Sequence, residues 1–445
     1  MKNKELAHWA VTRGREQGAR QSEAYVLNHK SFSVRIRRGE VESIEQAQEQ
    51  GLGIRALVGE QMGFAYTSFL EKGPVEEAIS RAIANAGKTS ADRNNILPGP
   101  PSGLPELKLY DPTIVETPVE EKIRLAAAIE EAAFAADPRV IKTERATYGD
   151  TVYEVAIANS RGLDVNYKGS FCGGSVWVVA KENDDTQTGS GMDYVLNFAD
   201  LKPESIGQEA TEEAVAMLGA KRVSSQRVPI VMPPRVATQF LGVLAPALSG
   251  EAVQKGRSLL AGKLGKVVAS DIVTLIDDGT LSQGLNSSPV DGEGVPTDRT
   301  VLIEGGRLQT YLHNTYTAAK DGIISTGNAS RPSYRGTPEI GPSNLYLESG
   351  GSSQGELLQD ISQGFYLLEV LGMHTANPIS GDFSVGAAGL WIEKGELTYP
   401  VRGVAVAGNI LKLFRGVEAL GNDLRFYLGY GSPSIRFSPL TVSGE

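Results

Sequence analysis

An order of segments that occurs twice in the first half of the chain constrains its fold most. Each copy begins with a helical spacing of apolar residues, continues with runs in which apolar and polar residues alternate, and closes with a second helical pattern. The first copy is predicted to comprise an opening helix, strands at 31–37, 54–58 and 63–67, and a helix at 75–86. The second is predicted to comprise a helix at 117–137, strands at 152–158, 163–167 and 175–180, and a helix at 203–218. The first half is therefore expected to contain two related α+β units.

The remainder of the chain changes in character at about residue 226. A helix expected at 234–248 leads into many short strand-like runs, with hairpin turns at Gly305-Gly306 and Lys394-Gly395. A segment rich in proline and glycine at 91–105 suits a linker. We therefore expect an α+β protein with a two-part N-terminal half and a large, mainly antiparallel β domain. The expected boundaries are 1–111, 112–225 and 226–445.

Charge and cysteine content exclude several classes of protein. The formal net charge is -10, which argues against binding to nucleic acid phosphates. The single cysteine, Cys172, permits no intramolecular disulfide and suits a reducing compartment. No apolar stretch approaches the roughly 20 residues of a membrane helix, and no signal peptide is visible. We expect a cytoplasmic protein that contacts neither membrane nor nucleic acid.

No motif by itself predicts an active site. Ser353 lies in a G-x-S-x-G pattern, but His374, 21 residues later, is the only histidine that follows it. The 4 histidines show no zinc-binding spacing, and His313 is expected to be a surface or hydrogen-bonded residue. The acidic segment at 291–294 lacks the spacing of an EF-hand loop. An autonomous hydrolase with an unrecognised site, built on Ser353 or on a metal at His313, remains an alternative.

Several ordered motifs in the last half of the chain carry a resemblance. They are Asp291-Gly292-Glu293-Gly294-Val295-Pro296-Thr297, Val301-Leu302-Ile303-Glu304-Gly305-Gly306, Thr326-Gly327-Asn328-Ala329-Ser330-Arg331 with Ser333-Tyr334, Ser343-Asn344-Leu345, Ser380-Gly381-Asp382-Phe383-Ser384 and Gly421-Asn422-Asp423-Leu424. In order and spacing this series resembles the TldD/PmbA family, also called modulators of DNA gyrase. The opening region fits the family layout too, so the resemblance covers nearly the whole chain.

The resemblance implies a zinc metalloprotease built from two kinds of subunit. TldD-type members carry an HExxxH helix and a late cysteine that bind zinc, whereas PmbA (TldE)-type members lack these ligands. Here the corresponding helix should lie at 236–248, where Leu241, Gly242 and Pro246 align with the His-Glu and His positions. No cysteine follows the segment at 421–424. The chain thus resembles the PmbA (TldE) branch, with no catalytic or metal-binding residue and with zinc expected in a TldD-like partner.

The same resemblance implies partners and candidate residues. We expect the chain to bind a TldD-like subunit and to help to position an unfolded or extended peptide; the sequence leaves open whether the isolated chain forms a homodimer. Asp291, Glu293, Arg331 and Tyr334 are candidate groove or interface residues because they lie in the matching motifs. Ordering of loops is an equally good interpretation of these four residues. A homodimeric peptide-binding scaffold without protease function is a further alternative.

Overall fold

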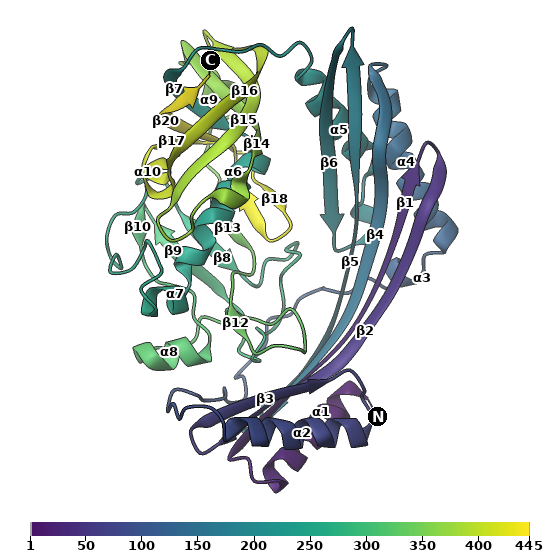
Figure 1. Cartoon of the computed structure of the whole chain (residues 1–445), viewed down its shortest axis with the longest axis vertical. Helices are drawn as coiled ribbons and strands as arrows, with labels where there is room; N and C mark the ends of the chain where they lie inside the picture. The colour runs from purple at the N-terminus through teal and green to yellow at the C-terminus, as the bar shows by residue number, and fades with distance from the viewer. Residues whose placement is uncertain (1, 445) are drawn as a thin grey trace.

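One long, curved antiparallel sheet dominates the N-terminal half of the computed structural model, which describes residues 2–444 (Figure 1). Its strand order is β3-β2-β1-β4-β5-β6. The strands are β1 (Gln21–Arg37), β2 (Glu40–Val58), β3 (Gln61–Thr67), β4 (Val140–Asn159), β5 (Asp164–Glu182) and β6 (Asp185–Val195). Four of them span 17 to 20 residues, well beyond the roughly 3–10 residues of most strands. The strands predicted at 152–158, 163–167 and 175–180 are parts of these longer elements.

Tight turns connect neighbouring strands of this sheet. Arg38 and Gly39 both have positive φ angles, 55° and 75°, as a two-residue hairpin loop requires. Gly59 also has a positive φ angle, 62°, in the turn between β2 and β3. The turn residues therefore set the hairpin register, and β1 pairs with β2 along the whole of both strands except for one bulge beside Arg35.

Two helix pairs cover opposite ends of one face of the sheet. Helices α1 (Asn3–Glu16) and α2 (Lys72–Ala86) pack on one end, and α4 (Val119–Ala136) and α5 (Pro203–Ala216) pack on the other. Each pair has its own apolar core, which confirms the predicted repetition of helix, strands and helix. Because β1 pairs with β4, the two units share a single sheet. The division at residues 111 and 112 stays a prediction.

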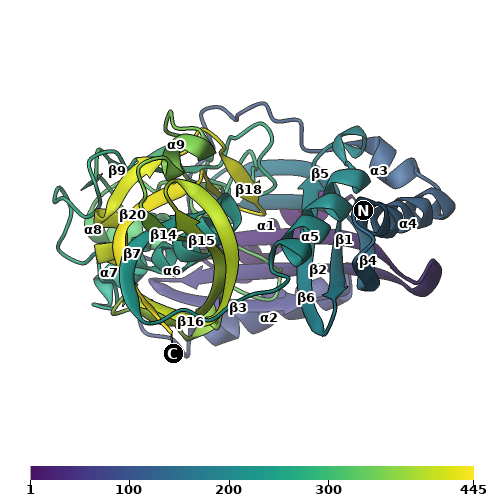
Figure 2. The same ribbon diagram turned by 90° about the horizontal axis from the view of Figure 1, so that it is seen from above.

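A closed barrel forms the upper part of the C-terminal region (Figure 2). Its strands are β7 (Gln226–Met232), β14 (Gln363–Leu371), β15 (Asp382–Glu393), β16 (Glu396–Asn409) and β20 (Ile435–Ser443), and β17 (Val417–Leu420) pairs with β20. Pairing of β16 with β20 closes the ring. The β7–β14 pair is parallel and the other pairs are antiparallel, so the predicted, mainly antiparallel arrangement is confirmed.

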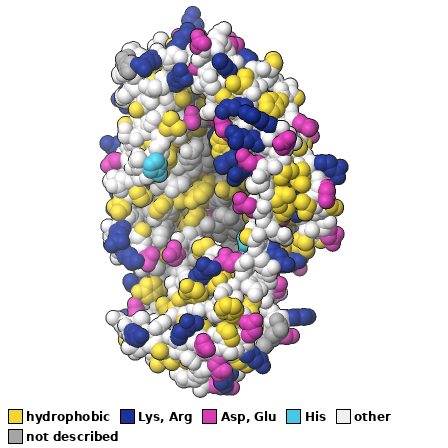
Figure 3. Space-filling view, turned by 45° about the vertical axis from the view of Figure 1, so that its right-hand side comes forward, with side chains coloured by type: hydrophobic (Ala, Val, Ile, Leu, Met, Phe, Trp, Pro, Cys, Tyr) yellow, Lys and Arg dark blue, Asp and Glu magenta, His cyan; other side chains and the backbone are white. Residues whose placement is uncertain are grey.

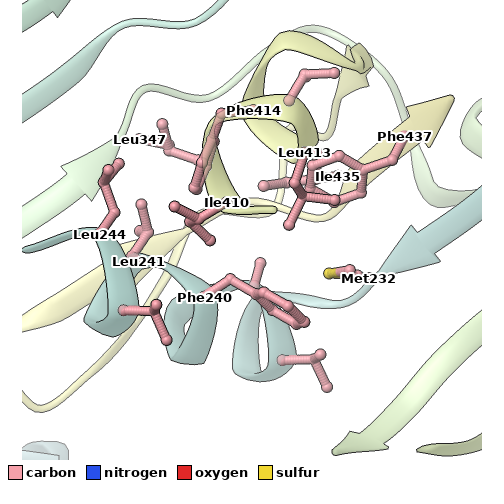
Figure 4. Close-up of a cluster of buried hydrophobic side chains, with 14 of the residues drawn as sticks. Met232, Phe240, Leu241, Leu244, Leu347, Ile410, Leu413, Phe414, Ile435 and Phe437 are labelled. Carbon is pink, nitrogen blue, oxygen red and sulfur yellow. The ribbon is translucent and has the colours of Figure 1, made fainter. Parts of the chain in front are cut away.

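Helix α6 (Pro234–Leu244) lies inside this ring, as Figure 2 shows. Most of its side chains are buried, and a stripe that contains Arg235, Gln239 and Gly242 is partly exposed. Phe240, Leu241 and Leu244 point into a cluster with Ile410 and Phe414 (Figure 4). The expected helix at 234–248 ends as a 3-10 turn, Ala245–Leu248, where Pro246 has no N–H to donate. Burial of this apolar helix supplies the core of the barrel.

A second sheet and several short elements complete the C-terminal region. The second sheet has the order β10-β9-β8-β13-β19-β18, formed by β8 (Leu275–Asp278), β9 (Arg299–Glu304), β10 (Arg307–Leu308), β13 (Leu345–Leu347), β18 (Arg425–Tyr427) and β19 (Tyr430–Ser432). The remaining elements are α3 (Pro112–Glu116), α7 (Gly250–Gln254), α8 (Thr315–Asp321), α9 (Gln354–Leu358), α10 (Ile410–Arg415), the pair β11 (Ala329–Ser330) and β12 (Glu339–Ile340), and the 3-10 turns Phe198–Asp200 and Met373–Thr375. Across residues 2–444, no helix is both long and apolar enough to cross a membrane.

Candidate functional site

A cleft separates the open face of the long sheet from the C-terminal region (Figure 3). One cavity in this cleft has a volume of about 440 Å³. One wall consists of side chains from β1, β4 and β5, and the other consists of loops around Asp291, Asn328 and Ser343. In Figure 3 hydrophobic side chains line much of this hollow. The cleft is therefore a concave, partly aromatic surface between two parts of the chain that are distant in sequence.

Alternation along the strands places aromatic residues on the cleft side. On β4 and β5, Tyr153, Tyr167 and Phe171 face the cavity, whereas the residues directly before and after each of them point to the other face of the sheet. The rings of Tyr153 and Tyr167 meet edge to face, with centroids 6.4 Å apart. Gly169 lies directly opposite Tyr153, and a Cβ there would come within 2.3 Å of the ring. Glycine at this position therefore lets the tyrosine ring lie across the sheet.

The two tyrosines remain neutral over the physiological pH range. Burial raises the pKa of Tyr153 to about 12. Burial, with smaller contributions from Tyr25 and Tyr153, raises the pKa of Tyr167 well above its ordinary value. Their hydroxyl groups therefore stay protonated and can donate hydrogen bonds into the cleft.

Beside the cavity, four buried charged residues join the sheet to the C-terminal region. Arg55 Nη1 donates to Glu293 Oε1 at 2.8 Å, and Arg55 Nε donates to Glu23 Oε1 at 2.8 Å. Arg331 Nη1 donates to the same Glu23 oxygen at 2.8 Å. Glu293 Oε2 also accepts from the backbone N–H of Thr315 at 2.8 Å. This charged junction (Glu23, Arg55, Glu293 and Arg331) alternates in sign and holds the two halves together.

The electrostatics of the junction follow from burial and from pairing. Burial alone would raise the pKa of Glu23, but the neighbouring Arg55 and Arg331 lower it. Burial would lower the pKa of Arg55, yet Glu23 and Glu293 raise it above its usual range. Burial lowers the pKa of Arg331, and the negative charge of Glu23 opposes this shift. The guanidinium carbon also lies 4.3 Å from the centre of the Tyr25 ring, a cation–π contact that stabilises the charge. Each charge is thus stabilised by a partner from the opposite side of the junction.

Asp291 shapes the loop that enters this junction. Its Oδ1 accepts from the backbone N–H groups of Glu293 at 2.9 Å and Val295 at 3.0 Å, and its Oδ2 accepts from that of Ala329 at 3.0 Å. Burial, together with the nearby Glu293, raises the pKa of Asp291 to about 7. These bonds make Asp291 a loop-ordering residue at the edge of the cavity.

A second buried acid, Asp277, lies on the neighbouring strand β8. It accepts from Asn328 Nδ2 at 2.6 Å and from the backbone N–H of Ser343 at 2.8 Å. Burial raises its pKa to about 7. Asn328 and Ser343 both line the cavity, so Asp277 fixes two residues of the cavity wall from behind.

Tyr334 packs flat against the sheet. It is buried, and its ring lies so close to Gly51 that a Cβ there would be 2.2 Å from Cε2. Its ring also meets Tyr66 edge to face, at a centroid distance of 6.0 Å. Tyr334 therefore packs against β2 and β3 next to the charged junction.

The structure thus brings together all four residues singled out from the motifs. Asp291 and Arg331 line the cavity, whereas Glu293 and Tyr334 lie within the contact between the two halves. Their assignment as groove or interface residues stays a prediction. Sequence reasoning missed Glu23 and Arg55, because they lie 308 and 238 positions from Arg331 and Glu293. It also missed the aromatic wall, whose only signal is the spacing of aromatic residues at alternate positions on β4 and β5.

The alternative hydrolase residues have ordinary structural contacts. Ser353 is the N-cap of α9, where it accepts from the backbone N–H of Glu356 at 3.3 Å and donates to the Glu356 carboxylate at 2.9 Å. His313 is buried, and its Nδ1 lies 3.2 Å from Thr317 Oγ1. Burial lowers the pKa of His313. Neither residue lines the cavity.

The helix that aligns with the zinc-binding helix does not fit a metal ion. Leu241 is fully buried among apolar side chains, and Gly242 offers no side chain. Within residues 2–444 no group of three or more His, Cys, Asp or Glu side chains could hold a metal ion. Structural and catalytic zinc sites need three or four such ligands. The residues at this position thus provide no zinc-binding set.

Comparisons with known proteins agree with this architecture over the whole chain. Residues 22–88, 112–218 and 225–444 match the models for PmbA/TldA metallopeptidase domain 1, the central domain and the C-terminal domain, respectively. Metalloprotease PmbA of Escherichia coli O157:H7 is 30% identical over 443 residues, which cover 97% of this chain and 93% of that protein.

Solved structures give the same result. A Thermotoga maritima protein, named for a proposed role as a modulator of a DNA gyrase, superposes with a TM-score of 0.91 at 31% identity, covering 99% of each chain. TldE from Thermococcus kodakarensis superposes with a TM-score of 0.90 at 25% identity, covering 99% of this chain and 100% of that one. The chain therefore belongs to the PmbA/TldD metallopeptidase family.

Proposed function

We propose that this chain is a PmbA (TldE)-like subunit that does not itself cut peptides and that acts with a zinc-bearing, TldD-like partner in the cytoplasm. The observation that carries the proposal is the apolar character of α6. Where a zinc-binding member would present two imidazoles and a carboxylate, Leu241 is packed against Ile410 and Phe414. A helix buried in this way contributes to stability and offers no Lewis acid or general base.

The cleft supports a role in positioning peptides. The cleft is concave and partly aromatic, and a second hollow, which shares Phe171 with the cavity, continues along the sheet to Glu45 and Ala47 of β2. Strand β3 pairs with β2 only over residues 52–58, so in the described part of the chain residues 40–50 of β2 have β1 as their single neighbour. An extended peptide can add to such an edge through backbone hydrogen bonds. The chain would thus form part of the wall of a shared proteolytic chamber.

Zinc analysis combined with peptide cleavage tests the proposal. The purified chain is assayed alone, its TldD-like partner is assayed alone, and the two are assayed together on an unfolded peptide. We expect no bound zinc and no cleavage for the chain alone, with cleavage by the mixture exceeding that of the partner. Ser353→Ala and His313→Ala are the matched variants for the hydrolase alternative.

Two outcomes would overturn the proposal. Stoichiometric zinc or robust cleavage by the isolated chain, abolished by one of those two substitutions, would establish an autonomous hydrolase. A stable homodimer that binds peptide but neither associates with the partner nor alters its cleavage would establish a scaffold without protease function.

A further inference from the structure

We propose that the cavity beside the charged junction is a side-chain pocket that takes one large, uncharged side chain, aromatic or aliphatic, from an extended peptide lying in the cleft. The inference rests on the proposed function only in taking a peptide as the ligand. It adds a preference for one class of side chain and assigns that preference to this chain rather than to its partner.

The size and the walls of the cavity suit such a side chain. Its volume of about 440 Å³ lies within the roughly 300–1,000 Å³ of typical ligand pockets. Tyr153, Tyr167 and Phe171 line the sheet side of the cavity together with the apolar side chains of Leu27 and Val155. The Phe171 ring meets Tyr194 edge to face at 6.4 Å, so its position is fixed by packing within the sheet. Removal of apolar ligand surface from water against this wall is favourable.

The polar groups of the wall are placed to hold the peptide rather than a charge. Neither the Tyr153 nor the Tyr167 hydroxyl has a hydrogen-bond partner in residues 2–444. Because both phenols remain protonated, each can donate to a peptide carbonyl at the mouth of the pocket. Aromatic walls with a few free donors are typical of sites that bind an apolar group in one orientation.

The charges near the cavity are already paired. Three backbone N–H groups satisfy Asp291, and Arg331 Nη1 pairs with Glu23. Arg331 Nη2 has no hydrogen-bond partner in residues 2–444, but it is buried and the charge of the guanidinium is balanced by Glu23. Besides Asp291, Arg331 and the tyrosines, the lining residues include one ionisable side chain, that of His29, which is half-buried. A Lys, Arg, Asp or Glu side chain of the ligand would lose its hydration without gaining a free counter-charge. The pocket is therefore expected to reject charged side chains.

The direct test is peptide binding by the isolated full-length chain. Three acetylated and amidated Gly-Ser hexapeptides, identical except for one central Phe, Asp or Lys, are titrated by isothermal titration calorimetry. We expect the Phe peptide to bind at least about ten-fold more tightly than either charged peptide, a difference in the range that one apolar pocket can produce. Equal dissociation constants, or no measurable binding of the Phe peptide, would overturn the pocket.

Variants then locate the preference. Phe171→Ala opens one wall and should reduce the preference for Phe several-fold. Phe134→Ala is the matched control, because this exposed phenylalanine lies on α4, across the sheet from the cleft. Tyr153→Phe keeps the volume of the wall but removes a hydroxyl that can donate to the backbone of the peptide. It should therefore weaken the binding of all three peptides equally. Equal effects of Phe171→Ala and Phe134→Ala on the preference would place the binding site elsewhere.

The outcome is separable from that of the proposed function. A binding preference in the isolated chain, together with a partner whose cleavage this chain does not alter, would leave the pocket in place and contradict the subunit role. Enhanced cleavage in the mixture without any binding preference would support the subunit role and remove the pocket.

Discussion

At the scale of single residues, close contacts between glycines and aromatic rings decide how the sheet meets the rest of the chain. A Cβ at Gly51, Gly169 or Gly173 would lie 2.2 to 2.3 Å from a tyrosine ring. Each ring lies directly against the glycine backbone, so a side chain at the glycine position would displace the ring. Single residues also decide the charged junction, where loss of Glu23 would remove the carboxylate that Arg55 and Arg331 share and leave Arg55 with Glu293 alone.

Substitution of Gly51 by alanine should destabilise the fold. The new Cβ would collide with the buried Tyr334 ring, and relief of such overpacking costs about 1–3 kcal/mol. Urea unfolding of the variant measures the loss. Gly103→Ala is the matched control, since a Cβ there meets nothing within 4 Å and the φ angle is ordinary. Equal midpoints for both variants would show that the ring moves aside freely.

Substitution of Glu23 by alanine should be more severe. It leaves Arg55 and Arg331 buried without their shared carboxylate, which typically costs about 3–5 kcal/mol. Thermal unfolding is the measurement, and Glu49→Ala is the control, because its pair with Arg335 is exposed and should change the unfolding temperature little. A similar small shift for both variants would contradict the role assigned to the junction.

At the scale of elements, α6 links the fold to the proposed loss of catalysis. The same apolar residues that exclude zinc ligands fill the barrel, so this helix is a packing element. The sequence predicts this helix because its apolar residues recur at helical spacing opposite a stripe with Arg235 and Gln239, a pattern typical of a helix packed against a core.

Truncation of this helix tests its packing role. Leu241→Ala should destabilise the chain by about 2–5 kcal/mol, because the site is fully buried and the cavity cannot collapse easily. The neighbouring Gly242→Ala should be neutral or mildly stabilising, since its Cβ would meet nothing and alanine favours a helix. Denaturant unfolding compares the two, and equal losses would show that α6 is not packed as described.

At the scale of the whole molecule, two halves enclose a cleft, and buried acids hold the loops on one side of it. Asp277 and Asp291 both have a pKa raised to about 7, so the folded state favours their protonated forms. The stability that each contributes is present below the unfolded pKa of 3.8 and is lost as pH rises through about 7.

The pH dependence of stability can therefore be predicted for one of these acids. Between pH 5 and pH 8, the wild type should lose about 1–3 kcal/mol of unfolding free energy relative to the Asp277→Asn variant. Urea unfolding at the two pH values measures it, with Asp360→Asn, an exposed acid, as control. A difference that does not vary with pH would show that Asp277 is ionised in the folded state throughout.

The sequence by itself determined the local elements of this protein. Alternation predicted the strands, and glycine positions predicted the turns at Gly305-Gly306 and Lys394-Gly395, because these signals depend on neighbouring residues alone. The family motifs located Asp291, Glu293, Arg331 and Tyr334. The full length of the long strands was underestimated, since their polar stretches do not alternate clearly with apolar residues.

Only the tertiary structure decided which distant segments meet. Closure of the barrel by β16 and β20, and the approach of Glu23 and Arg55 to Arg331 and Glu293, join parts of the chain that carry no local signal of each other. The aromatic wall becomes a cavity only when the C-terminal loops cover it. Such contacts depend on how whole sheets curve and dock, and that is settled by burial of apolar surface over the entire molecule rather than by the residues adjacent in sequence.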